Sequence, residues 1–207
     1  MLKNKGLLII GLLLGIVLLA GSGLFFWRQR RSVSVSVPLV TPPLTKDTAY
    51  EVYQTADGNF SFEYPSTWVR TEIEDLDEVL PKYFIDKYQL EMPAALSDPG
   101  GAQITLSIYY FTKGKNLDEI MDTLEAELVA MGQPYNETSR QMVGGSLVVD
   151  STVEEEGGTV RVRDILFLVF GEDKDAVYNL SLSAPLASWG KYETTFSRIQ
   201  NSAGLSR

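Results

Sequence analysis

The side chains that could carry chemistry in this sequence are mainly carboxylates, because its 207 residues include no cysteine and no histidine. Without cysteine there are no disulfides, thiolate metal ligands or cysteine nucleophiles. Without histidine, the commonest general base, the usual zinc ligand and the usual pH switch near neutrality are also missing. Acidic runs, paired carboxylates and serines without histidine partners remain as candidates.

Two acidic runs are candidates for a metal site. The first contains Glu72, Glu74, Asp75, Asp77 and Glu78. It lacks the alternating ligands and the glycine of a calcium-binding loop. The second, weaker candidate contains Glu172, Asp173 and Asp175, and is more simply a turn between strands. Isolated acidic runs are usually solvated faces. We therefore predict no cofactor, and keep calcium or small-ligand binding as an alternative.

A third acidic run suggests a protein contact. Glu154, Glu155 and Glu156 precede two glycines, which predicts an exposed hairpin tip available to a basic partner. Paired carboxylates can hydrolyse glycosides, but each pair here lies in acid-rich sequence with no evident cause for a raised pKa. No serine or lysine lies in a nucleophile motif. We expect a binding protein rather than an enzyme, with a hydrolase as the remaining alternative.

The charge distribution separates the amino terminus from the rest of the chain. Five of the 18 basic residues flank an apolar run, and no acid precedes Asp47. Residues 32–207 therefore carry 13 basic and 27 acidic side chains, a net charge of −14. A domain this acidic repels phosphate backbones, so we predict no nucleic-acid partner.

Residues 7–27 contain no charge and predict a transmembrane anchor. At about 1.5 Å per residue, this run reaches about 30 Å, the thickness of the hydrocarbon core of a bilayer. Its apolar positions include Leu7, Ile9, Leu13, Ile16, Leu19, Phe25 and Trp27. The run continues past the weak cleavage sites near Ala20, so we expect it to be retained as a signal anchor. Gly11 and Gly15 would permit weak self-association.

The chain divides into four regions: a tail at 1–6, the anchor at 7–27, a basic stop and Pro/Ser/Val-rich linker at 28–48, and one domain at 49–207. Basic residues nearly balance across the anchor, so the positive-inside rule does not decide its orientation. The short tail and the stalk-like linker favour an extracytoplasmic domain. We therefore predict a single-pass membrane protein.

Residue patterns within the domain predict an antiparallel sheet with helices. Strands are expected at 50–54, 60–64, 102–112, 138–143, 146–155, 159–170 and 176–183, with an extended piece at 65–70. Helices are expected at 117–131, after an N-cap at Asn116, and at 188–202. Residues 72–99 predict only short helical turns. A set of aromatic residues could line a ligand pocket, although core packing is more usual: Tyr83, Phe84, Tyr88, Tyr109, Tyr110 and Phe111.

Two segments carry a family resemblance. Residues 59–68 read Asn-Phe-Ser-Phe-Glu-Tyr-Pro-Ser-Thr-Trp, and residues 177–185 read Val-Tyr-Asn-Leu-Ser-Leu-Ser-Ala-Pro. With the central helix, they resemble the PsbP-like proteins over nearly the whole domain. The resemblance implies an α+β fold, an α-β-α sandwich around an antiparallel sheet, which is shared with a Ran-binding nuclear import factor. It also implies a binding or assembly role rather than catalysis.

These expectations combine into one functional prediction. The chain is expected to be a membrane-anchored accessory factor whose extracytoplasmic domain contacts a protein partner at the membrane surface. The matched residues are mostly aromatic and apolar, so they indicate the fold rather than a site. Oxygen evolution is not carried over, because the chain departs from the photosynthetic members in having no histidine and no lumenal transit sequence.

A tag placed after Arg207 should be digested by protease added to intact cells or spheroplasts, because the anchor and linker favour an extracytoplasmic domain. The measurement is loss of the tag without permeabilisation. Protection in intact cells, with cleavage only after permeabilisation, would instead place the domain in the cytoplasm.

Overall fold

The computed structural model describes residues 49–71, 76, 80–132, 135–155 and 157–206. Within these ranges, no helix combines the length and apolar character needed to cross a bilayer. The predicted anchor at 7–27, with Gly11 and Gly15, lies outside the described residues, as does the linker. The same holds for the first acidic run: Glu72, Glu74, Asp75, Asp77 and Glu78.

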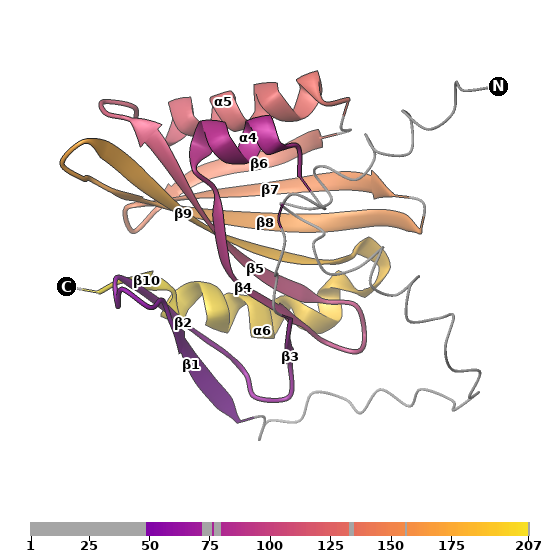
Figure 1. The fold of residues 1–207 in the computed structure, drawn as a ribbon. Coiled ribbons are helices and arrows are strands. Elements are labelled where there is room, and N and C mark those ends of the chain that lie inside the picture. Colours follow the sequence, from indigo (N-terminus) through magenta and orange to yellow (C-terminus); the bar gives the residue numbers. More distant parts are fainter. Residues whose placement is uncertain (1–48, 72–75, 77–79, 133–134, 156, 207) are drawn as a thin grey trace.

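An antiparallel sheet of seven strands forms the centre of the described domain, in the order β3-β4-β5-β9-β8-β7-β6 (Figure 1). Its strands are β3 Val69–Thr71, β4 Glu91–Ser97, β5 Gln103–Thr112, β6 Tyr135–Val143, β7 Ser146–Glu155, β8 Gly158–Val169 and β9 Lys174–Pro185. A smaller sheet pairs β2 (Phe60–Pro65) with β1 (Tyr50–Gln54) and β10 (Gly204–Leu205). The predicted antiparallel sheet is confirmed.

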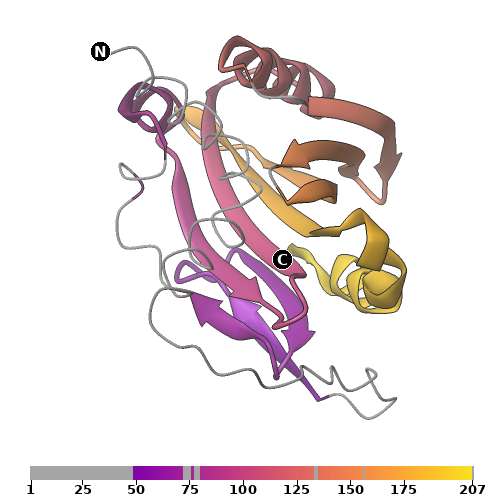
Figure 2. The same ribbon diagram turned by 90° about the vertical axis from the view of Figure 1, so that its right-hand side faces the viewer.

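Helices cover both faces of the main sheet (Figure 2). On one face lie α4 (Lys82–Tyr88) and α5 (Leu117–Ala130); on the other lies α6 (Trp189–Ser202), which follows the short turn η2 (Leu186–Ser188). Each face has its own hydrophobic core, one including residues of α4 and α5 and the other residues of α6 and the small sheet. The domain is therefore layered as helix, sheet and helix.

The helix α5 forms where its sequence pattern predicts it. The Asn116 side chain accepts a hydrogen bond from the Glu119 amide at 2.9 Å, and the Glu119 carboxylate accepts one from the Asn116 amide at 3.0 Å. This capping box satisfies two amides at the helix start. The apolar positions of the helix are buried against the sheet: Leu117, Ile120, Met121, Leu124 and Leu128. The predicted N-cap and the helix that follows it are both confirmed.

The other core is an aromatic cluster around Phe196 of α6. Its ring lies 6.3 Å from Trp68, 4.9 Å from Trp189 and 5.9 Å from Tyr192, between ring centroids. All four side chains are buried. The helix predicted at 188–202 is confirmed, and Trp68, from the connection between β2 and β3, packs against its aromatic face.

Residues 72–99 differ from their prediction. Short helical turns were expected, and α4 is one, but Glu91–Ser97 forms the strand β4 beside β5. Pro93 lies inside this strand and lacks an amide hydrogen for the ladder. The register of β4 with β5 shifts between Glu91 and Ala94, which accommodates the proline. The sequence did not predict this strand because proline is rare inside strands.

Substituting Phe196→Ala should lower the free energy of unfolding by about 3–5 kcal/mol, because it removes a fully buried ring and leaves a cavity. Equilibrium urea unfolding followed by circular dichroism measures the change. Val129→Ala is the control, since Val129 is 60% exposed and should shift stability by less than about 1 kcal/mol. Equal effects would contradict the packing of α6.

Candidate functional site

The second acidic run lies at the hairpin that joins β8 to β9. Glu172 and Asp173 are exposed in its loop, as the turn prediction expects, whereas Asp175 is buried at the start of β9. The Asp175 carboxylate accepts hydrogen bonds from the amides of Gly114, at 3.2 Å, and Gly171, at 3.4 Å. Asp175 therefore braces two neighbouring loops. Among the described residues, no group of three or more acids is placed to hold a metal.

Phe170 begins the loop of this hairpin. Its side chain is 78% exposed, more than any other large hydrophobic side chain in the described ranges. The chain turns tightly behind it, since a Cβ on Gly171 would lie 2.1 Å from the carbonyl oxygen of Lys174. The bond from the Gly171 amide to Asp175 also holds the loop. An apolar ring is thus displayed to solvent on a braced loop.

The third acidic run lies at the β7–β8 hairpin, but its members differ. Glu154 is exposed and accepts a hydrogen bond from the Thr159 hydroxyl at 2.9 Å. Glu155 is partly buried, and burial raises its pKa to about 7. Its Oε1 accepts no hydrogen bond from the part of the chain that the structure describes. Glu156 lies outside the described residues. Whether these acids contact a partner stays a prediction.

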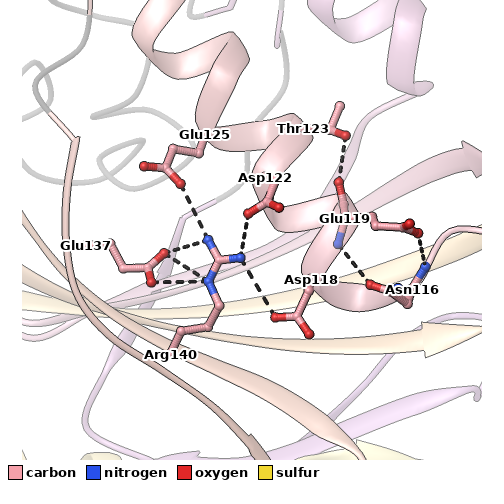
Figure 3. Close-up of polar contacts among 8 residues, drawn as sticks. All are labelled: Asn116, Asp118, Glu119, Asp122, Thr123, Glu125, Glu137 and Arg140. Atoms are coloured by element: carbon pink, nitrogen blue, oxygen red, sulfur yellow. Dashed lines mark hydrogen bonds and ion pairs between the residues drawn. The ribbon is translucent and has the colours of Figure 1, made fainter.

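Arg140 of β6 joins the sheet to α5 (Figure 3). Its guanidinium lies 2.6 Å from Glu137, also on β6, and 2.6 Å from Asp122 on α5. Asp118 and Glu125 of the same helix lie 3.8 Å and 3.4 Å away. Hydrogen bonding to Glu137 is the main cause that raises the pKa of Arg140 above its usual range. The guanidinium is therefore fully engaged in fastening α5 to β6.

Polar side chains occupy the centre of the main sheet on the face toward α4 and α5. We call this set the central polar face. It comprises Gln103, Thr105 and Ser107 of β5, Asn179, Ser181 and Ser183 of β9, Asp164 of β8 and Ser151 of β7. Each is at most 5% exposed. The opposite face of the same strands is apolar, with Leu106, Leu180 and Leu182 in the core beneath α6.

The strand register brings these side chains together. Gln103 pairs with Ser183, Thr105 with Ser181, and Ser107 with Asn179. These are three successive pairs on one face, because side chains alternate between faces along a strand. Asp164 on β8 also pairs with Ser181, from the other side of β9. The polar side chains therefore form one continuous patch over adjacent strands.

Asp164 is the charged group of this patch. Its Oδ1 accepts a hydrogen bond from the Asn179 amide nitrogen at 3.1 Å and another from the Ser181 hydroxyl. Burial raises the pKa of Asp164 to about 6 from an ordinary 3.8, while these two hydrogen bonds act in the opposite direction. Burial also raises the pKa of Tyr109 well above its usual range, and the charge of Asp164 adds to that increase.

Several polar atoms on this side of the sheet have no hydrogen-bond partner among the described residues. Gln103 Oε1, Ser151 Oγ and Asn179 Oδ1 of the central polar face are buried without a hydrogen bond, as are Tyr135 Oη and Glu155 Oε1 toward β6 and the end of β7. A buried polar atom that lacks every partner, ordered water included, costs about 1–3 kcal/mol. Buried polar groups are normally paired with protein groups or ordered water, so five such atoms on one side of the sheet are unusual.

The central polar face was not among the predicted sites. Its strands were predicted from the residue patterns at 102–112, 146–155, 159–170 and 176–183, and that prediction is confirmed. The available signal was the alternation of polar and apolar residues at 103–108 and 179–183. Such alternation normally indicates a strand with one solvated face. It could not reveal that both faces are buried. The suggested aromatic pocket set includes core residues: Phe84, Tyr88, Tyr109 and Phe111.

No protein-family model matches the sequence, and no curated protein matches it either. Solved structures do match. Cyanobacterial PsbP (CyanoP) from Synechocystis sp. PCC 6803 has 11% identity and a TM-score of 0.52, covering 82% of this chain and 100% of that one. LpqN of Mycobacterium tuberculosis, described as involved in cell envelope biogenesis, has 11% identity and a TM-score of 0.51, covering 78% of this chain and 92% of that one.

A third match is the Ran-binding protein Mog1p of Saccharomyces cerevisiae, with 11% identity and a TM-score of 0.46, covering 76% of this chain and 96% of that one. The first two likenesses show that the domain has the PsbP-like fold. The resemblance predicted from residues 59–68 and 177–185 is therefore confirmed for the fold. At this level of identity it does not extend to a function.

Asp164→Asn should stabilise the domain at pH 7 by about 2–3 kcal/mol, because the folded state holds this carboxylate with a raised pKa. Between about pH 4 and pH 6 the folded chain keeps a proton that the unfolded chain has released, so stability falls as pH rises. The advantage of the variant should vanish below about pH 4. Urea unfolding from pH 3.5 to 8 measures this; a pH-independent difference would contradict the raised pKa.

Proposed function

We propose that this chain is a membrane-tethered, non-catalytic binding module that contacts a protein partner at the membrane surface through the β8–β9 hairpin. The observation that carries the proposal is the exposure of Phe170 on a braced loop. Large aromatic side chains such as Phe are enriched at protein interfaces and are frequent anchors there. The chemical counterpart is an apolar pocket on the partner.

Bracing of the loop supports this role. Asp175 holds the amides of Gly114 and Gly171, so Phe170 stands on a loop that is already ordered before a partner arrives. Association loses less conformational entropy when the contacting segment is ordered in advance. Glu172 and Asp173 beside the ring add charges that would orient an incoming partner.

Tethering follows from the apolar run at 7–27. The linker at 28–48 would hold the domain near the bilayer on its extracytoplasmic side, within reach of other membrane or envelope proteins. The likeness to LpqN, described as involved in cell envelope biogenesis, is compatible with such a setting. A binding role also agrees with a sequence that lacks histidine and cysteine.

A photo-reactive benzoylphenylalanine in place of Phe170 should form one discrete protein adduct in native membranes, because that ring is expected to enter the partner. The adduct is detected by its mobility and by mass spectrometry. The matched control carries the same residue in place of Val52, which is 67% exposed on β1 and should give no such adduct. Recovery of the chain alone from both positions would refute the proposal.

A further inference from the structure

We infer that the outer edge of β6 pairs with the same strand of a second copy of this chain, which joins two seven-stranded sheets across a two-fold axis. This surface is separate from the β8–β9 loop and does not depend on the protein contact proposed above. Three observations support the inference: the open edge of β6, the bulge within the strand, and the residues that face each other when two copies pair.

β6 is the last strand of the main sheet, and among the described residues only β7 pairs with it. None of its nine residues is buried. Met142 and Val143, near its end, are 56% and 42% exposed although both are large and apolar. An edge strand presents amides and carbonyl groups to which another strand can add. A second strand would satisfy these groups and cover part of the apolar surface.

A bulge determines how two copies of β6 can pair. The register with β7 shifts between Glu137 and Ser139, so Thr138 has no partner of its own on β7. The residues on the side of α5 are therefore odd-numbered before the bulge and even-numbered after it: Tyr135, Glu137, Arg140 and Met142. Facing residues of antiparallel strands share a side of the sheet. Sides and bulges both match when Thr138 of each copy faces Ser139 of the other.

In this register, the facing residues of the two copies are complementary. The facing pairs are Glu137 with Arg140, Tyr135 with Met142, and Asn136 with Gln141. The first pair places opposite charges beside each other, the second brings apolar surfaces together, and the third joins two side-chain amides. Each pair occurs twice, because the two-fold axis repeats it. Cross-strand pairs of these kinds stabilise neighbouring strands, whereas like charges in the same positions would oppose them.

Acidic residues limit the strength of this contact. Asp118, Asp122 and Glu125 of α5 surround Arg140 together with Glu137, so four carboxylates and one guanidinium give a net charge of −3 in each copy (Figure 3). Two such groups repel each other across the interface. We therefore expect weak association that strengthens as salt screens the charges. Tethering of both copies to one membrane, as proposed above, would raise their effective concentration.

Two other occupants of the edge would give a different result. One is the linker segment 32–37, in which serine and valine alternate, and the other is an extended segment of another protein. Either would cover β6 and prevent contact between copies. The test below distinguishes them from a second copy.

The sequence contains no cysteine, so engineered cysteines give a direct test. Asn136→Cys and Gln141→Cys are combined in the full chain in detergent and oxidised with copper phenanthroline, at about 1 M NaCl, where the screening length is about 3 Å. Facing residues of two strands lie about 4.5–5.5 Å apart between Cα atoms, which permits a disulfide. Within one copy the two positions lie roughly 15 Å apart, too far for one. A disulfide-linked dimer is expected on non-reducing electrophoresis.

The matched control combines Asn136→Cys with Met142→Cys, since Met142 is also exposed but lies on the other side of the sheet. It should give at most a tenth as much dimer. Equal yields from the two combinations would indicate random collision, or contact through the predicted anchor alone, and would overturn the inference. So would an absence of dimer from the first combination, as either other occupant predicts. None of these results would affect crosslinking from position 170.

Discussion

The antiparallel pairing of β5 with β9 is the contact on which the rest of the structure depends. It runs without interruption from Gln103 and Ser183 to Thr112 and Lys174. One face of these strands carries the core beneath α6, and the other carries the central polar face and aromatic residues of the α4–α5 core. Asp175, which braces the β8–β9 loop, belongs to the same pairing, opposite Phe111. The bracing of the β8–β9 loop and the central polar face thus both depend on one pair of strands.

Elements set by local pattern could be predicted from the sequence. The helix α5 follows an N-cap and has apolar residues at helical spacing, and α6 buries the aromatic face that its spacing predicts. The strands with strong alternation also appear near their predicted bounds. By contrast, β4 contains Pro93 and depends on a bulge against β5, so only the neighbouring strand makes it recognisable. Local propensity carries no information about that partner.

The candidate sites were harder to predict because they depend on contacts between distant residues. Phe170 was expected at the end of a strand, but the strand ends at Val169 and leaves the ring in the loop. Its bracing by Asp175 and Gly114 joins two loops that are far apart in the sequence. The central polar face needs the register of four strands and the knowledge that both sheet faces are covered. Alternating residues in a single strand look the same whether a face is buried or solvated.

The long sequence separation across β5 and β9 also affects how the chain folds. Gln103 pairs with Ser183, 80 residues later in the chain. One edge of β5 therefore stays unpaired during folding until β9 has been added to the sheet. Contacts between distant residues slow folding, and an unpaired edge invites association with other chains. One face of β5 is polar along half of the strand, where it carries Gln103, Thr105 and Ser107. A polar face on an unpaired strand lowers its tendency to associate with other chains, so we expect β5 to be less prone to aggregation during folding than an apolar strand would be.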